Sequence, residues 1–226
     1  ENFFAENRFR EGLAYLTSAI EQRKMMRQSI DENWYRRGLT VAYNNEIVPE
    51  VYDFVSAWIA DYGSPANWRD AINLTRNLNE FQDQEMLDLI RLGKRVDSLS
   101  NKQDFIIYVE AADARRLPKE VKDIIEQGYA SGAVSRDDIY IADALSTANS
   151  RIESDRADLP LLEADAGAAD AGLRTVLAAA DAFLSYGEFE KAERFYTKGL
   201  TMPGVNTQQA LTRLGIAQAE LGKTAE

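Results

Sequence analysis

Two rows of side chains have types and spacings suited to holding a protein segment. Tyr35, Leu39 and Tyr43 recur every four residues, which places an aromatic and apolar strip on one face of a helix. A second row supplies hydrogen-bond donors that can hold an extended backbone or a carboxylate. It consists of Arg69, Asn73, Arg76 and Asn77. The alternative is structural: the tyrosines pack against neighbouring helices and the arginines lie in solvent.

Composition excludes several classes of catalysis. The chain has 226 residues and contains no cysteine and no histidine. Thiol nucleophiles, serine–histidine pairs and zinc sites built on nitrogen or sulfur are therefore excluded. Paired carboxylates could run acid–base chemistry, as in glycoside hydrolysis. However, no acid lies in a recognisable catalytic context, and no phosphate-binding glycine loop occurs. We therefore expect a protein that is not an enzyme and that needs no cofactor and no metal.

The charge is strongly acidic and unevenly distributed. The formal net charge is −11 and the pI is near 4.7, which argues against a nucleic-acid partner. Residues 137–190 hold twelve acidic side chains and three arginines, and so contribute −9 of that charge. This acidic sector could steer a basic partner toward the protein. The alternative is a solvated face that only keeps the chain soluble.

Nothing in the sequence predicts insertion into a membrane. No run of 18 apolar residues occurs, and the best apolar stretch, residues 176–184, is short and carries Asp181. The chain does not begin with methionine and shows no signal-peptide pattern. We therefore expect a fragment of a longer chain, with any targeting signal upstream. The compartment, cytoplasm or periplasm, is left open.

The spacing of apolar residues predicts helices along the whole chain. These residues mostly recur at intervals of three and four, which is helical periodicity. Ser64 before Pro65 is typical of a helix start, and Ser100 with Gln103 has the spacing of a capping box. The strand-like run at 105–109 continues into alanines without a turn signal, so we interpret it as a buried helix.

A spaced triplet of residues recurs six times. It consists of a small or medium residue, a larger apolar residue four positions later, and alanine or glycine three positions after that. The copy around Phe54 departs at its first member, Glu50. The final members are Ala19, Ala57, Gly93, Gly128, Ala164 and Gly199, separated by 38, 36, 35, 36 and 35 residues. These positions share one helix face, and the small final residue indicates close contact with the preceding helix. Helix pairs of this kind bury their faces by stacking on neighbours.

The repeat resembles the tetratricopeptide repeat, a helix–turn–helix unit of about 34 residues. The clearest copy spans 173–206, and its second-helix segment is similar to the family pattern. The matching residues are Gly187, Phe189, Ala192, Tyr196, Gly199 and Leu200. Trp34 and Trp68 lie at or near the position of the first-helix aromatic residue.

The resemblance implies an all-α, right-handed superhelical solenoid of antiparallel helix–turn–helix repeats. A single array over 1–226 would comprise approximate repeats at 1–30, 31–63, 64–99, 100–134, 135–172 and 173–206, with a partial repeat at 207–226. The copies at 31–63, 64–99 and 135–172 are degenerate. In the last of these, Pro160 is expected to mark a late start of the second helix.

The resemblance also implies a function. Arrays of this family line their concave face with first helices and bind peptides or protein segments there. We therefore expect a bacterial-type, non-catalytic scaffold for protein–protein interaction, with the two rows above as its candidate contacts. The alternative is a domain that acts in self-association, or as the non-catalytic part of a larger enzyme or envelope-assembly protein. Because both ends fall inside a repeat, end-to-end self-association is also expected.

Overall fold

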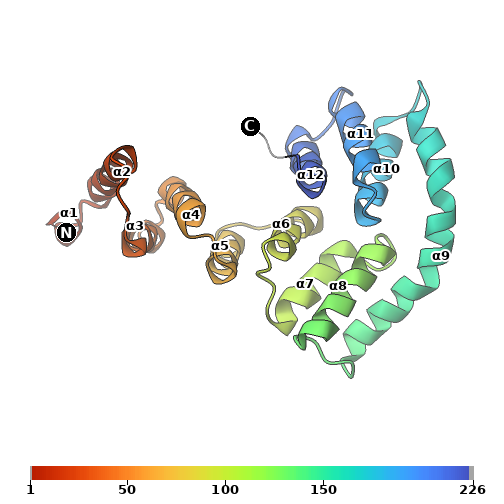
Figure 1. Cartoon of the computed structure of the whole chain (residues 1–226), viewed down its shortest axis with the longest axis horizontal. Helices are drawn as coiled ribbons and strands as arrows, with labels where there is room; N and C mark the ends of the chain where they lie inside the picture. The colour runs from red at the N-terminus through yellow and green to blue at the C-terminus, as the bar shows by residue number, and fades with distance from the viewer. Residues whose placement is uncertain (1, 224–226) are drawn as a thin grey trace. The chain divides into compact units, whose positions relative to one another are not determined.

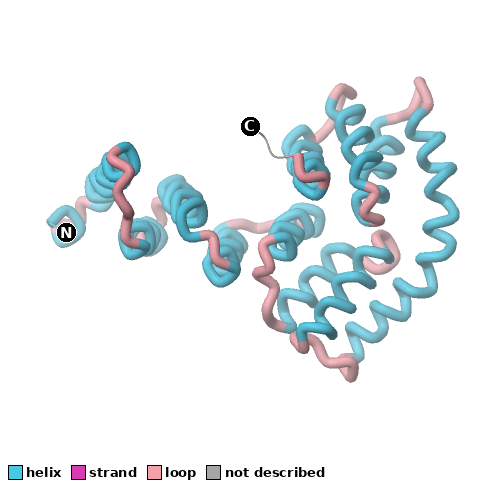
Figure 2. The backbone as a smooth tube through the Cα atoms, in the orientation of Figure 1, coloured by secondary structure: helices cyan, strands magenta, loops and turns pink. Residues whose placement is uncertain are grey.

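The computed structural model describes residues 2–223, which form twelve α-helices and, within this range, no strand (Figures 1 and 2). Within each unit, most helices that follow one another along the chain pack together, and the prediction of an all-α protein is confirmed for the residues described. The described residues divide into two compact units. Unit 1 comprises residues 2–80 and 95–98, and unit 2 comprises residues 81–94 and 99–223. The superhelical hand and the single continuous array stay predictions.

Unit 1 contains the first five helices. They are α1 (Asn2–Ala5), α2 (Phe9–Met25), α3 (Glu32–Asn44), α4 (Val48–Tyr62) and α5 (Pro65–Leu78). The Ser64 side chain accepts a hydrogen bond from the Asn67 amide at 3.2 Å, which confirms the predicted helix start before Pro65. Side-chain caps of this kind satisfy amide groups that have no partner in the first turn.

The core of unit 1 is built around the α3–α4 pair. Trp58 and Tyr35 are fully buried there, with Val51 and Phe54 beside them. At Gly38 a β-carbon would lie 2.3 Å from the Phe54 ring, so only glycine lets α3 approach α4 this closely.

Unit 2 contains the remaining seven helices. They are α6 (Asp83–Arg95, whose last residue belongs to unit 1), α7 (Lys102–Ala112), α8 (Pro118–Ser131), α9 (Ile139–Gly167), α10 (Leu173–Ser185), α11 (Phe189–Leu200) and α12 (Thr207–Glu220). Figure 1 shows these helices following a curve that brings α12 back beside α6. Two apolar clusters fill the unit, one around Phe105 and Ile124, the other around Phe183 and Phe195.

Two small residues of the triplet, both glycines, lie at close helix contacts. A β-carbon at Gly128 would lie 2.9 Å from the Phe105 ring on α7, and one at Gly199 would lie 2.7 Å from Leu177 on α10. In both cases the contact is with the preceding helix, as the spacing predicts. The copy at 157–164 behaves differently, because its Leu161 side chain is exposed.

Two local expectations were wrong. Pro160 does not start a helix: α9 runs for 29 residues with Pro160 inside it, and Figure 2 shows it as one continuous helical tube. Proline removes one hydrogen bond without ending the helix here, since strong helix formers surround it. The capping box of α7 is Asn101 with Asp104, one residue later than Ser100 with Gln103. A carboxylate at this position complements the helix dipole better than an amide.

Helices that combine the length and the apolar character needed to cross a membrane are not found among residues 2–223.

Candidate functional site

The predicted aromatic strip lies on α3 of unit 1, and its three members differ in burial. Tyr35 is fully buried and donates a hydrogen bond from its hydroxyl to Asp61. Leu39 is half-buried against the core of unit 1. Tyr43 is exposed and is the member with surface to offer a partner. That the strip contacts a peptide stays a prediction.

The predicted donor row lies on α5. Arg69, Asn73 and Arg76 are half-buried, and Asn77 is exposed. The Arg76 Nη1 group donates to the Asn73 side-chain oxygen at 3.3 Å, so these two members are brought together. Their role in binding also stays a prediction.

A pocket of about 340 Å³ lies in unit 2, between helices that the sequence did not single out for binding. Four segments line it: the start of α6, the end of α7, the α7–α8 turn and the first half of α9. The lining residues are Asp83, Gln84, Val109, Glu110, Ala111, Asp113, Ala114, Arg115, Arg116, Tyr140, Asp143, Ala144 and Thr147. Residues 140, 143, 144 and 147 share one face because helical neighbours recur every three to four positions.

The pocket is lined with more negative than positive charge. Asp83, Glu110, Asp113 and Asp143 contribute carboxylates, and all four residues are exposed. Tyr140 is 45% exposed. Burial, and then the negative charges of Glu110 and Asp113, raise the pKa of Tyr140 above its usual value. The tyrosine therefore keeps its proton, so its hydroxyl can donate a hydrogen bond and its ring can meet a cation.

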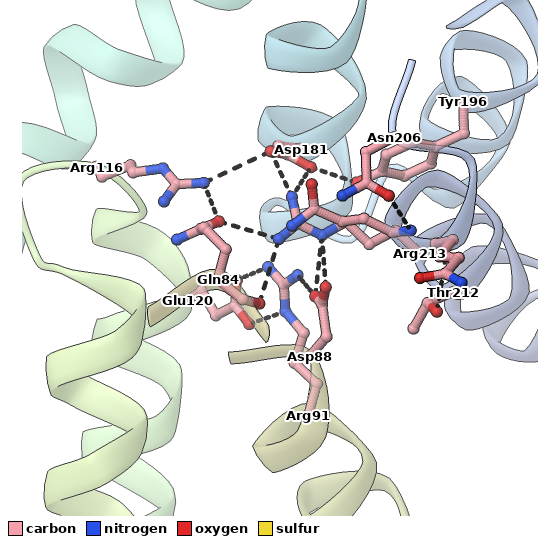
Figure 3. Close-up of polar contacts among 12 residues, drawn as sticks. Gln84, Asp88, Arg91, Arg116, Glu120, Asp181, Tyr196, Asn206, Thr212 and Arg213 are labelled. Atoms are coloured by element: carbon pink, nitrogen blue, oxygen red, sulfur yellow. Dashed lines mark hydrogen bonds and ion pairs between the residues drawn. The ribbon is translucent and has the colours of Figure 1, made fainter. Parts of the chain in front are cut away.

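A buried cluster of charged side chains lies beside the pocket and joins α6 to α12 (Figure 3). Arg213 on α12 donates from Nε to both carboxylate oxygens of Asp88, at 2.9 and 3.0 Å. Its Nη1 group donates to both oxygens of Asp181 on α10, each at 2.8 Å. The Tyr196 hydroxyl donates to Asp181 at 2.6 Å. One guanidinium thus joins three helices.

The second half of this cluster joins α6 to α8 and α7. Arg91 donates to Glu120 from Nε at 2.8 Å and from Nη2 at 2.6 Å, and to Asp88 from Nη1 at 3.1 Å. The Tyr108 hydroxyl donates to the same Glu120 at 2.7 Å. Because the side chains of Arg91, Asp88 and Glu120 are each below 10% exposed, these interactions are shielded from water and salt.

The environment shifts the two buried carboxyl groups of α6 and α8 in opposite directions. Burial raises the pKa of Asp88, and the positive charges of Arg213 and Arg91 offset this only in part. Burial opposes ionisation of Glu120 too, but Arg91 and the Tyr108 hydroxyl hold the pKa of that carboxyl below its usual value. Glu120 is therefore the carboxylate whose ionised form the fold stabilises.

We expect this shift to appear in the pH dependence of stability. The pKa of this carboxyl group is lower in the folded protein than in the unfolded chain, where it is near 4.5, so the group stabilises the fold at pH values above 4.5. That contribution is lost as the pH falls through the lowered pKa of the folded protein. The difference in unfolding free energy between the wild type and Glu120→Gln should therefore be constant from neutral pH down to about pH 6. It should shrink below 4.5. Urea unfolding monitored by circular dichroism at each pH measures it, and a difference that widened in acid would contradict the assignment.

The sequence contained a partial signal for this cluster. Asp181 interrupts the apolar stretch at 176–184, and Asp88 and Arg91 lie beside Leu87 and Ile90 on the buried face of α6. A charged residue on an apolar face indicates a buried partner. Nothing in the local sequence identifies Arg213 as that partner, since it lies 125 residues from Asp88.

Comparisons of this chain with protein-family models, with curated proteins and with solved structures find no match.

Proposed function

We propose that the chain is a non-catalytic, tetratricopeptide-like scaffold, and that its unit 2 pocket binds a basic, extended segment of a partner protein. The helix pairs and the close contacts at Gly128 and Gly199 support the kinship to the repeat. The observation that carries the proposed binding is a pocket lined by four carboxylates beside an aromatic side chain. A right-handed superhelix is part of the same proposal.

The chemistry of the pocket favours lysine or arginine as its occupant. Carboxylates accept charge-assisted hydrogen bonds from both side chains, and the ring of Tyr140 can lie against a cation. The carboxylates come from α6, α7, the α7–α8 turn and α9, so an extended segment can meet them one after another. Arg116 is already engaged by Gln84 and lies 3.6 Å from the Asp181 carboxylate, which offsets its charge.

The acidic sector favours the same kind of partner. Residues 137–190 carry −9, and this segment includes Tyr140 and Asp143 of the pocket. A field of one sign accelerates encounter with a partner of the opposite sign and weakens as salt is added.

We expect the removal of pocket carboxylates to weaken the binding of a basic peptide. A fluorescein-labelled peptide of alternating lysine and glycine serves as the probe, with fluorescence anisotropy as the readout. The double variant Glu110→Gln/Asp113→Asn should weaken its binding by about fivefold or more, since each exposed charge pair contributes up to about 1 kcal/mol. The peptide should be recovered intact by mass spectrometry after prolonged incubation, as expected for binding without turnover.

The matched control removes two acidic charges elsewhere on the same unit. Glu153→Gln/Asp165→Asn changes the net charge equally, on exposed positions of α9 that do not line the pocket. It should alter affinity by less than about twofold. If both double variants weaken binding equally, the peptide responds to net charge alone and the pocket is not its site.

A further inference from the structure

Arg213 does not line the pocket but contacts a residue that does. Its side chain is only 5% exposed, and besides Asp88 and Asp181 it contacts Gln84 at the start of α6. The Nη2 group donates to the Gln84 side-chain oxygen at 3.0 Å and approaches the Gln84 backbone oxygen at 3.5 Å. Gln84 lines the pocket, so the C-terminal helix of unit 2 is connected to one wall of the proposed binding site.

A second wall residue is held by the same set of contacts. Arg116 lines the pocket and donates to the same Gln84 oxygen that Arg213 contacts. Arg116 also lies 3.6 Å from the Asp181 carboxylate. Arg213 donates two hydrogen bonds to that same carboxylate. Figure 3 shows the side chains of Gln84 on α6 and Arg116 in the α7–α8 turn converging with that of Arg213 on α12.

The geometry of arginine is what makes this arrangement possible. A guanidinium presents five donors in a planar fork, and here Nε, Nη1 and Nη2 each point to a different residue. Lysine carries the same charge on one nitrogen and cannot meet Asp88, Asp181 and Gln84 together. Buried ion pairs add little stability relative to apolar packing, so fixing one arrangement is the better-supported use of this cluster.

We propose that Arg213 is a positioning residue for the unit 2 pocket, which it shapes by holding Gln84 directly and Arg116 through Asp181. Arg213 can affect partner binding only if the pocket is the binding site, so the functional part of the inference rests on the proposed function. The structural part does not. The two parts can therefore be tested separately on the full chain.

A single introduced thiol reports on the pocket without any ligand. The chain contains no cysteine, so Thr147→Cys places one unique thiol on the α9 side of the pocket. Its rate of reaction with Ellman's reagent is measured in conditions where every variant is folded by circular dichroism. In this background Arg213→Lys should change the rate by at least about threefold. Arg194→Met should leave the rate unchanged, because Arg194 pairs with Glu163 on an exposed face of α11 and does not line the pocket.

A double-mutant cycle separates positioning from general destabilisation. Gln84→Met removes the acceptor while leaving Asp88 and Asp181 intact, and it should reproduce most of the rate change. Adding Arg213→Lys to Gln84→Met should then change the rate by clearly less than Arg213→Lys does alone, since the contact with Gln84 is already lost and only the route through Asp181 to Arg116 remains. Additive effects would overturn the proposal. So would Arg213→Lys leaving the thiol rate at its wild-type value.

Peptide affinity completes the test. If the lysine–glycine peptide binds the wild type, Arg213→Lys should weaken it by about threefold or more while Arg194→Met does not. Unchanged affinity beside a changed thiol rate would overturn the functional part. If the peptide fails to bind the wild type, the proposed function fails, and the thiol rates alone still decide whether Arg213 positions the pocket.

Discussion

Arg91→Met is expected to lower the free energy of unfolding by about 3–5 kcal/mol, the usual cost of removing one partner of a buried ion pair. Arg91 makes two hydrogen bonds to Glu120 and one to Asp88, and its side chain is 6% exposed. Methionine fills much of the space but leaves Glu120 with the Tyr108 hydroxyl as its remaining hydrogen-bond donor among the residues described. An ionised carboxylate in that position is poorly solvated, so it either becomes protonated or opens the local packing.

Two further variants make this expectation specific. Arg91→Met/Glu120→Gln removes the orphaned charge as well and should recover about 2 kcal/mol or more of the loss. Arg194→Met deletes an arginine whose side chain is 58% exposed and that pairs with Glu163, and it should cost no more than about 1 kcal/mol.

Far-UV circular dichroism in urea is the appropriate measurement for the Arg91 series. All three tryptophans, Trp34, Trp58 and Trp68, lie in unit 1, so tryptophan fluorescence does not report directly on unit 2. An Arg91→Met protein that unfolds within about 1 kcal/mol of the wild type would show that Glu120 finds another partner or water. In that case the buried cluster contributes less than its geometry indicates.

Trp58→Ala is expected to destabilise unit 1 by about 3–5 kcal/mol. The side chain is 1% exposed and lies in the core formed by α3 and α4. Its Nε1 group donates to Glu32 at 2.9 Å, and the Arg36 guanidinium lies 4.5 Å from the ring centroid. Alanine removes the ring and leaves a cavity that the flanking helices can close only in part.

Trp58→Phe separates the two contributions of this side chain. Phenylalanine keeps most of the volume but loses the hydrogen bond to Glu32, which still accepts from Arg36 and Asn67. The cost should therefore be about 1–2 kcal/mol. Fluorescence of the remaining Trp34 and Trp68 during urea unfolding measures both variants within unit 1. Equal losses for alanine and phenylalanine would assign the effect to the hydrogen bond and not to the packing.

Much of the helical framework could be predicted from local sequence. The caps at Ser64 and the spacing of three and four that encodes the helices depend on residues within a few positions of one another. The close helix contacts at Gly128 and Gly199 could also be predicted locally, because a glycine at a fixed spacing indicates that a neighbouring helix approaches there. Pro160 misled for a related reason: proline weakens a helix locally, but flanking residues decided that α9 continues.

The candidate site, in contrast, could not be predicted from local sequence. Tyr35 belongs to the predicted strip by its spacing, and the structure places its hydroxyl against Asp61 and its ring in the core of unit 1. A spacing of four residues does not distinguish such a buried member from an exposed one such as Tyr43. The unit 2 pocket draws its carboxylates from α6, α7, the α7–α8 turn and α9, none of which shares a motif with the others.

The sequence by itself determined most of the helices, the close contacts at Gly128 and Gly199, the acidic charge and the absence of cysteine and histidine. These properties follow from composition and from periodicities within one or two helical turns. Only the tertiary structure decided that Arg213 meets Asp88 across 125 residues and reaches the pocket through Gln84. That pairing depends on the direction of every helix between α6 and α12, including the unbroken α9. No local sequence pattern determines how these directions add up over 125 residues.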